Sequence, residues 1–415
     1  MLFGTNSFLN QQGGSIKLGW NFQANAPNSF QASSGTIEFI GNRFAQISSA
    51  SGNYFHDLRI NKASLSNQVM LATDVVVNND LFMVGGNLTV SSRSLTVSRD
   101  LIISGGRLSG NEAADLIKVG RNWQNTVGSS AFAEGSGTVE FFSGQNAYIG
   151  SETFNHLRIN KPSSQSQLAR IAASNSVAVK GNLSVLSGCL VPMGDTVLDV
   201  TGNVTISSGA GIRLLADGAL LPSLLLSGNL TDNNTSWGLY FSFNATEASN
   251  FILKGSTDQN LNSSSTFLNV FNMTVDKPGG GIYVNKSLDA RGKLHIVRGF
   301  YASSTTNRIK YVYGDFIVES AGMFTDSTGE VQLRGASDTY LRIEGQFYTP
   351  TITIQKNNSN RKIIATGSVN LWDNTILTMN NGIFELSPGS ILRLRHGSSI
   401  NVGAATKFMA LGSAA

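Results

Sequence analysis

Apolar and polar residues alternate along short stretches of this chain, and one such stretch recurs four times. Its apolar positions are Ile37 and Phe39, Val139 and Phe141, Phe251 and Leu253, and Val331 and Leu333. The residues beside them are mostly Thr, Glu, Gln or Lys. A period of two predicts β-strands with one buried face and one solvated face.

A second alternating stretch follows each of the four. Its apolar positions are Leu58 and Ile60, Leu157 and Ile159, Met273 and Val275, and Ile352 and Ile354. We call the four recurrences repeat blocks, and each opens near a turn glycine: Gly19, Gly120, Gly228 and Gly314, at intervals of 101, 108 and 86 residues. Recurrence of a unit along the whole chain predicts an elongated repeat architecture.

Shorter phrases repeat at about the length of one coil. The phrase that begins at Gly181 returns at Gly202, and about 20 residues suffice for three short strands and three corners. The sequence therefore predicts an all-β fold, a right-handed parallel β-helix (β-solenoid) of about 20 coils in parallel register. Its four degenerate blocks span residues 1–117, 118–227, 228–313 and 314–415, and the third block contains an insertion. No long Pro, Gly and Ser linker separates them, so we expect one continuous rod.

The composition supports many tight turns and few helices. The 415 residues include 44 Gly and only 7 Pro, and charged residues are 13%, against about 25% in an ordinary domain. A net charge of +4 without basic runs gives no electrostatic basis for nucleic-acid binding. No stretch is apolar enough to span a membrane. The single cysteine, Cys189, lies in an apolar stretch, which favours a buried thiol over a nucleophile.

Candidate chemistry is sparse. Enzymes with this fold that cleave acidic polysaccharides need clustered carboxylates beside a cation, and the best local set is Asp276, Lys277, Asp289, Arg291 and His295. Its first two members stand where other blocks have Asn and Lys, so the repeat explains them without catalysis. We expect no catalytic residues, no cofactor and no metal site.

The histidines also argue against a zinc site. They occupy unmatched repeat positions and form no metal-binding spacing, which favours solvated corner residues: His56, His156, His295 and His396. Asp326 and Asp338 are isolated rather than part of a calcium repeat.

Lysines and tryptophans also recur in the blocks. A lysine closes each block: Lys62, Lys161, Lys277 and Lys356. We interpret these lysines as solubilising corner charges that discourage sheet stacking, because they are too far apart to bind one small ligand. The alternative is a ligand-binding row that a polymer or a surface would meet in succession. The tryptophans near the block openings are Trp20, Trp123 and Trp237. Core packing is the preferred interpretation of their role, whereas exposed rings would favour sugar-stacking platforms.

Block 2 carries the clearest form of the repeat, with GRNW from Gly120, GTVEF from Gly137 and FNHLRINK from Phe154. This pattern resembles the β-helical repeats of giant cell-surface and adhesin-like proteins of diderm bacteria, often those associated with type IX secretion. The resemblance implies an extracellular, adhesive or structural role and supplies no catalytic residues. A signal sequence and a sorting domain of that family are not recognised in the chain.

Two hypotheses follow. The first is a non-enzymatic structural or adhesive rod, a stalk or fibre segment of a larger surface protein. Neither end reads as a polar cap, so we expect a piece of something longer or ends that join other copies into a filament. Its partners would be such copies or flanking repeats, surface glycans or the cell envelope. The alternative is a β-helix that binds or cleaves carbohydrate.

Overall fold

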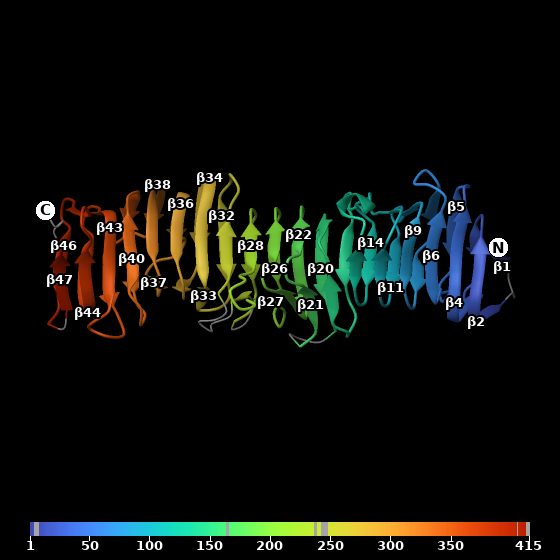
Figure 1. The fold of residues 1–415 in the computed structure, drawn as a ribbon, viewed down its shortest axis with the longest axis horizontal. Coiled ribbons are helices and arrows are strands. Elements are labelled where there is room, and N and C mark those ends of the chain that lie inside the picture. Colours follow the sequence, from blue (N-terminus) through green and yellow to red (C-terminus); the bar gives the residue numbers. More distant parts are fainter. Residues whose placement is uncertain (4–7, 163–165, 236–238, 242–247, 405, 412–415) are drawn as a thin grey trace. The chain divides into compact units, whose positions relative to one another are not determined.

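The computed structural model consists of stacked coils of short parallel strands (Figure 1). It describes all residues except 4–7, 163–165, 236–238, 242–247, 405 and 412–415. About 60% of the chain is strand, arranged as a β-solenoid of about 18 turns. Within the described residues the one helical segment is a short 3-10 turn, η1 (Ser129–Ala131). The predicted all-β solenoid is confirmed.

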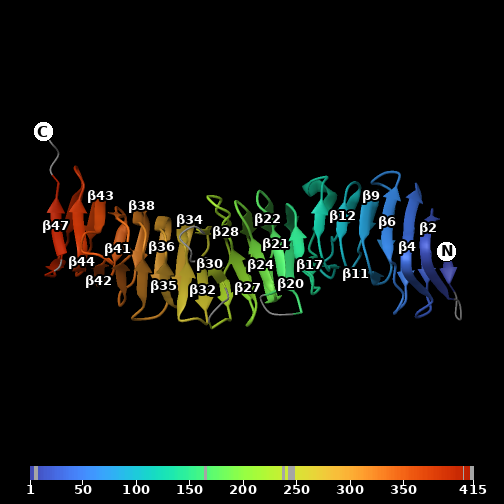
Figure 2. The same cartoon turned by 60° about the horizontal axis from the view of Figure 1, so that its bottom comes forward.

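The coils group into two compact units. Unit 1 comprises residues Met1–Asp199 and Gly209–Ile212, and unit 2 comprises Val200–Ser208 and Arg213–Ala415. In each unit, strands of successive coils lie side by side, for example β4, β6 and β9, or β36, β38 and β40, whose bounds follow (Figures 1 and 2).

Unit 1 has three sets of strands. One sheet contains β1 (Leu2–Phe3), β3 (Phe22–Ala24), β5 (Ala45–Ser49), β7 (Gln68–Leu71), β10 (Asn87–Thr89), β13 (Arg107–Ser109) and β16 (Phe132–Ala133). A second contains β2 (Leu9–Leu18), β4 (Phe30–Gly41), β6 (Asp57–Lys62), β9 (Leu81–Gly85), β12 (Leu101–Ile103), β15 (Trp123–Asn125), β18 (Ala147–Ile149), β21 (Leu168–Ile171) and β24 (Cys189–Pro192). The third contains β8 (Val75–Val77), β11 (Ser94–Val97), β14 (Leu116–Val119), β17 (Thr138–Phe141), β20 (His156–Asn160) and β23 (Leu183–Ser187), and the pair β19 (Glu152–Phe154) and β22 (Ser176–Val179). At the boundary of the units are β25 (Val197–Val200) and β27 (Gly211–Leu214).

Unit 2 contains the remaining strands. One sheet, here the β33–β46 sheet, contains β33 (Phe267–Val270), β35 (Ser287–Ala290), β37 (Ile309–Val312), β39 (Glu330–Leu333), β42 (Thr351–Gln355), β44 (Ile376–Leu386) and β46 (Ser399–Val402). The others are β26 (Val204–Ile206), β28 (Ser223–Leu226), β29 (Leu230–Asp232), β30 (Leu239–Phe241), β31 (Asn250–Leu253), β32 (Gln259–Ser263), β34 (Asn272–Val284), β36 (Leu294–Ser303), β38 (Phe316–Thr325), β40 (Thr339–Ile343), β41 (Gln346–Tyr348), β43 (Lys362–Leu371), β45 (Ile391–Leu394) and β47 (Thr406–Ala410).

The two recurring stretches of each block pair with each other in adjacent coils. Their inward positions are parallel register partners: Ile37 with Leu58 and Phe39 with Ile60, Val139 with Leu157 and Phe141 with Ile159, Phe251 with Met273 and Leu253 with Val275, and Val331 with Ile352 and Leu333 with Ile354. All sixteen side chains are at most 2% exposed. Because the apolar residues alternate with a period of two, those of one coil stack directly on those of the adjacent coil.

The coils vary in length, which explains why about 18 turns form where about 20 were predicted. Glu140 and Arg158, side by side in adjacent coils, are 18 residues apart. The backbone N–H of Asn260 bonds to the side chain of Asn229 in the previous coil, 31 residues away. Corner loops absorb the difference, since the paired strands keep their register while the connections lengthen.

The block-opening glycines serve different purposes. A Cβ on Gly120 would lie 1.9 Å from the carbonyl oxygen of Ser98, and those on Gly228 and Gly314 would lie 2.3 and 2.5 Å from backbone oxygens. At these three positions the preceding coil passes too close for any side chain. No atom lies within 4 Å of the corresponding point on Gly19.

Candidate functional site

The four lysines that close the blocks lie inside the solenoid. Their exposed fractions are 3% for Lys62, 0% for Lys161, 1% for Lys277 and 1% for Lys356. The interpretation of these lysines as solubilising corner charges is therefore wrong. Burial also prevents their ammonium groups from meeting an external ligand as a row.

In unit 1 each buried ammonium bonds to the backbone of an earlier coil. Lys62 Nζ donates to the carbonyl oxygen of Ile40 at 2.9 Å. Lys161 Nζ donates to the carbonyl oxygens of Ser143 and Gln145 at 3.1 and 2.6 Å. Charged donors make the stronger class of hydrogen bond, so these lysines hold consecutive coils together at a corner.

The lysines of unit 2 do the same. Lys277 Nζ donates to the carbonyl oxygen of Lys254 at 3.2 Å and to Oε1 of Gln259 at 2.7 Å. Lys356 Nζ donates to the carbonyl oxygen of Arg334 at 2.8 Å. Burial lowers the pKa of all four lysines, to about 8 for Lys161 and Lys356. The closing lysine, which recurs in every block, thus has a structural role: its ammonium connects consecutive coils.

A cluster of three aromatic rings fills the same place in blocks 1 and 2. It consists of Phe22, Phe30 and Phe55 in block 1, and of Trp123, Phe132 and Phe154 in block 2. The Phe22–Phe30 rings lie 4.9 Å apart at 74°, and the Trp123–Phe132 rings 4.8 Å apart at 74°. Edge-to-face pairs of this kind add about 0.5–1.5 kcal/mol beyond burial.

The three tryptophans predicted to pack in the core differ in burial. Trp123 is fully buried, and its Nε1 donates to the buried carboxylate of Glu152 at 3.1 Å. Trp20 is 55% exposed with the guanidinium of Arg43 5.0 Å from its ring centroid, so core packing is wrong for Trp20. The equivalent of Trp123 is Phe22, because GWNF aligns with GRNW. Trp237 lies outside the described residues.

Carboxylates on the outer side of the repeat strands form ion-pair ladders across coils. Glu38 lies between Lys17 at 3.6 Å and Arg59 at 3.3 Å. Glu140 likewise lies between Lys118 at 3.6 Å and Arg158 at 3.1 Å. The outer positions of blocks 1 and 2 therefore also connect one coil to the next.

The predicted carboxylate set is divided among separate pairs. Asp276 Oδ1 is bound by Arg298 Nε, and His295 Nε2 lies 2.9 Å from a carboxylate oxygen of Glu319. Asp276 lies on β34 and His295 lies on β36, the strand paired with it. Asp289 lies on a different strand, β35, which pairs with β33 and β37.

Asp289 is buried and has a shifted pKa. It is 7% exposed, and burial raises its pKa even though Arg291 Nη2 lies 2.9 Å away and acts in the opposite direction. Lys277 is one of the four buried closing lysines, and its ammonium bonds to Lys254 and Gln259. The five residues thus do not form one constellation.

The other candidates from the sequence have ordinary positions. Cys189 is buried, as expected for a core thiol. His396 is exposed and the other three histidines are half-buried, with Nδ1 of His156 accepting from the backbone N–H of Asn182. Asp326, described from the sequence as isolated, is buried in an ion pair with Lys310.

The described residues contain no group of three His, Cys, Asp or Glu side chains placed to hold a metal ion. In that same part of the chain, no helix has the length and apolar character needed to cross a membrane.

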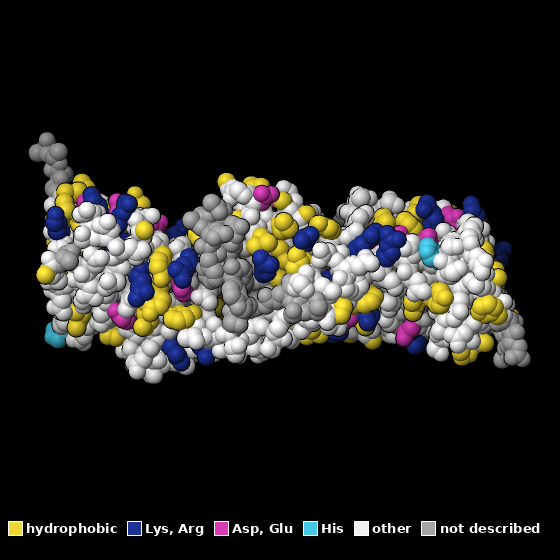
Figure 3. All heavy atoms as spheres, turned by 90° about the horizontal axis from the view of Figure 1, so that it is seen from below, with side chains coloured by type: hydrophobic (Ala, Val, Ile, Leu, Met, Phe, Trp, Pro, Cys, Tyr) yellow, Lys and Arg dark blue, Asp and Glu magenta, His cyan; other side chains and the backbone are white. Residues whose placement is uncertain are grey.

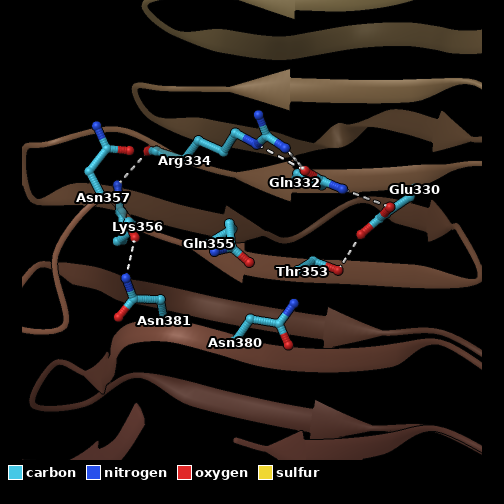
Figure 4. Close-up of a pocket in the computed structure, with 9 residues that line it drawn as sticks. All are labelled: Glu330, Gln332, Arg334, Thr353, Gln355, Lys356, Asn357, Asn380 and Asn381. Atoms are coloured by element: carbon cyan, nitrogen blue, oxygen red, sulfur yellow. Dashed lines mark hydrogen bonds between the residues drawn. The ribbon is translucent and has the colours of Figure 1, made fainter. Parts of the chain in front are cut away.

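A polar groove lies on the outer side of the β33–β46 sheet, within unit 2 (Figure 4). It has a volume of about 490 Å³ and is lined by Glu330, Gln332, Arg334, Thr353, Gln355, Lys356, Asn357, Asn380 and Asn381. Uncharged amides and a hydroxyl outnumber charged groups in this lining. The groove could not be predicted from the sequence, because its lining combines residues of three strands, β39, β42 and β44, that only the stacking of coils brings together.

The face of the molecule visible in Figure 3 is mainly uncharged. In Figure 3, uncharged polar side chains and backbone dominate the visible face of each unit, and charges are scattered. No family model, no curated protein and no solved structure matches the chain.

Proposed function

We propose that the chain is a non-enzymatic extracellular segment that provides structure and adhesion, a stalk or fibre portion of a larger bacterial surface protein. The observation that carries this proposal is the use of the repeated polar residue: all four closing lysines are buried and bonded to an earlier coil. Because the recurring lysine holds neighbouring coils together and is not available to a substrate, the repeat supports a mechanical role.

The outer surface supports the same proposal. The repeated carboxylates Glu38 and Glu140 are held between cations of neighbouring coils rather than offered to a substrate. Charged residues are only 13% of the chain, and a polar, weakly charged surface meets other polymers through hydrogen bonds rather than long-range attraction.

Association with further copies is part of this proposal. Three inward positions on β45, β46 and β47 are exposed: Leu394 by 46%, Val402 by 54% and Phe408 by 39%. Their register partners in the preceding coil are buried. We infer that the first coil of another copy, or of a flanking repeat of the same protein, covers them. If another copy covers them, light scattering across a concentration series should show assembly that Val402→Asp abolishes, and a monomer at every concentration would refute covering by another copy.

Immunogold labelling tests the cellular role. Antibodies raised against the purified chain should label the surface of intact cells of the source organism, and Fab fragments should reduce attachment of these cells to a substratum. Label restricted to the cytoplasm of sectioned cells would overturn the extracellular assignment. Surface label without any effect of the Fab fragments would overturn the adhesive role.

A second candidate is a β-helix that binds or cleaves carbohydrate, and the exposed ring of Trp20 favours it. Cleavage is tested by incubating the chain with pectate and alginate and measuring the ultraviolet absorbance of unsaturated products. Our proposal expects none from the wild type or from the Asp276→Ala, Asp289→Ala, Arg291→Ala triple variant. Products from the wild type that the triple variant fails to release would establish the enzyme instead.

A further inference from the structure

Hydrogen bonds connect the side chains along one wall of the groove on the β33–β46 sheet. Arg334 Nε donates to Oε1 of Gln332 at 2.9 Å, and Gln332 Nε2 donates to Glu330 at 2.9 Å. The hydroxyl of Thr353 donates to the same carboxylate. Figure 4 shows this chain of hydrogen bonds crossing two coils. The guanidinium of Arg334 also lies 3.9 Å from the ring centroid of Tyr311.

The charged groups of the lining already have partners within the protein. Both oxygens of Glu330 accept hydrogen bonds, one from Gln332 and one from Thr353. Two nitrogens of Arg334 donate to Gln332. Lys356 is buried, and its ammonium bonds to neighbouring backbone and side-chain oxygens. An anionic ligand would therefore compete with existing internal interactions.

The neutral amides on the floor of the groove are different. In Figure 4 the side chains of Gln355 and Asn380 make no hydrogen bond to the other lining residues. Asn380 lies at a register shift, since Ile354 pairs with Met379 and Gln355 pairs with Asn381. A β-bulge of this kind turns the extra side chain out of the ladder and is common beside binding sites.

These amides define the chemistry of a ligand. Each carries two N–H donors and an acceptor oxygen, which matches hydroxyl groups, because a hydroxyl both donates and accepts. Gln355 and Asn380 lie on β42 and β44, adjacent strands that are about 4.8 Å apart. A ligand that used both would extend across coils.

We propose that this groove binds a neutral glycan through the amides of Gln355 and Asn380. The proposal deepens the adhesive role and rests on it. The Tyr311 ring already packs against two side chains, the guanidinium of Arg334 and the ring of Phe267, which is stacked at 5.6 Å. Recognition therefore relies on hydrogen bonds, and a single groove binds weakly, with Kd on the order of 1 mM.

Affinity electrophoresis of the full chain tests the proposal. Native gels containing dextran, xylan or hydroxyethyl cellulose provide neutral glycans, and gels containing alginate provide an acidic one. We expect retardation by at least one neutral polysaccharide, and about tenfold weaker binding for the double variant Gln355→Ala, Asn380→Ala. The matched control is Asn260→Ala, Asn262→Ala, which removes two exposed outward amides from β32 in the same unit, and it should bind like the wild type.

Three outcomes would overturn the proposal: retardation that the Gln355→Ala, Asn380→Ala variant retains, retardation by alginate alone, or no retardation in any gel. Because these side chains point outward and have no partner within the lining, circular dichroism should show an unchanged fold. Surface labelling of cells is a separate measurement, so the adhesive role and the groove can fail independently.

Discussion

Replacing Lys161 by methionine tests whether the buried lysines fasten the coils. Methionine keeps most of the apolar stem and removes the ammonium, which donates to the carbonyl oxygens of Ser143 and Gln145. Each of these two hydrogen bonds from a charged donor contributes about 1.5–3 kcal/mol, together about 3–6 kcal/mol, and the desolvation of the ammonium offsets part of this gain. We therefore expect Lys161→Met to lower the free energy of unfolding of unit 1 by about 2–4 kcal/mol.

The pH dependence provides a second measurement on the same variant. Burial lowers the pKa of Lys161 from 10.5 to about 8 in the folded state. Between these values the unfolded chain binds the proton more strongly, so this lysine adds stability as the pH rises from about 8 toward 10.5. The difference in unfolding free energy between wild type and Lys161→Met should widen across that window.

Guanidinium unfolding followed by far-UV circular dichroism gives both quantities, and hydrogen exchange in β17 and β20 locates the effect. Lys17→Met is the matched control, because the side chain of Lys17 is 62% exposed beside Glu38. An exposed pair of this type contributes less than about 1 kcal/mol. A loss for Lys161→Met no larger than that of the control, or a difference that narrows with rising pH, would refute the reasoning.

Three further predictions concern neighbouring features. Gly120→Ala should destabilise unit 1 by more than about 1 kcal/mol, because its Cβ would overlap a backbone oxygen, whereas Gly19→Ala at the equivalent open position should be neutral in thermal unfolding. Phe141→Ala should cost about 3–5 kcal/mol in guanidinium unfolding, since the ring is fully buried; a loss below about 1 kcal/mol would contradict this. Burial raises the pKa of Asp100, but hydrogen bonds from Arg121 and from the backbone N–H of Asn122 outweigh it and lower the pKa overall. Acid titration should therefore remove stability as the pH falls below about 4, and should remove less in Asp100→Asn.

The sequence was sufficient to predict the fold because alternation with a period of two reports directly on burial. The strands that contain Val139 and Leu157 were identified from that alternation, and they pair in parallel in adjacent coils. The coil count was less accurate, since corner loops such as the one before Asn260 lengthen a coil without changing the strand pattern.

The lysine interpretation failed although the sequence held the needed signal. Lys62 continues the alternation of Leu58 and Ile60, which places it on the inward side of β6. The periodicity conflicts with the residue type, because lysine is almost never fully buried unless it is paired. Carbonyl oxygens at the corner satisfy the ammonium, and no sequence pattern indicates where such backbone acceptors lie.

The tryptophan interpretation and the groove show two other limits. Trp20 lies in the bend before β3, outside the alternation of that strand, whereas Trp123 is the first residue of β15, so the shared residue type misled the comparison. The groove depends on a register shift at Asn380, which follows from the pairing of two coils and leaves no mark in the local sequence.

Amine-reactive labelling of the native protein, read by mass spectrometry, tests the central claim most directly. The account predicts that the closing lysines stay unmodified under conditions that label the exposed Lys17 and Lys180, whose side chains are 62% and 60% exposed. All should react once the chain is unfolded in guanidinium. Labelling of Lys62, Lys161, Lys277 and Lys356 in the native protein at the rate of Lys17 would contradict the account.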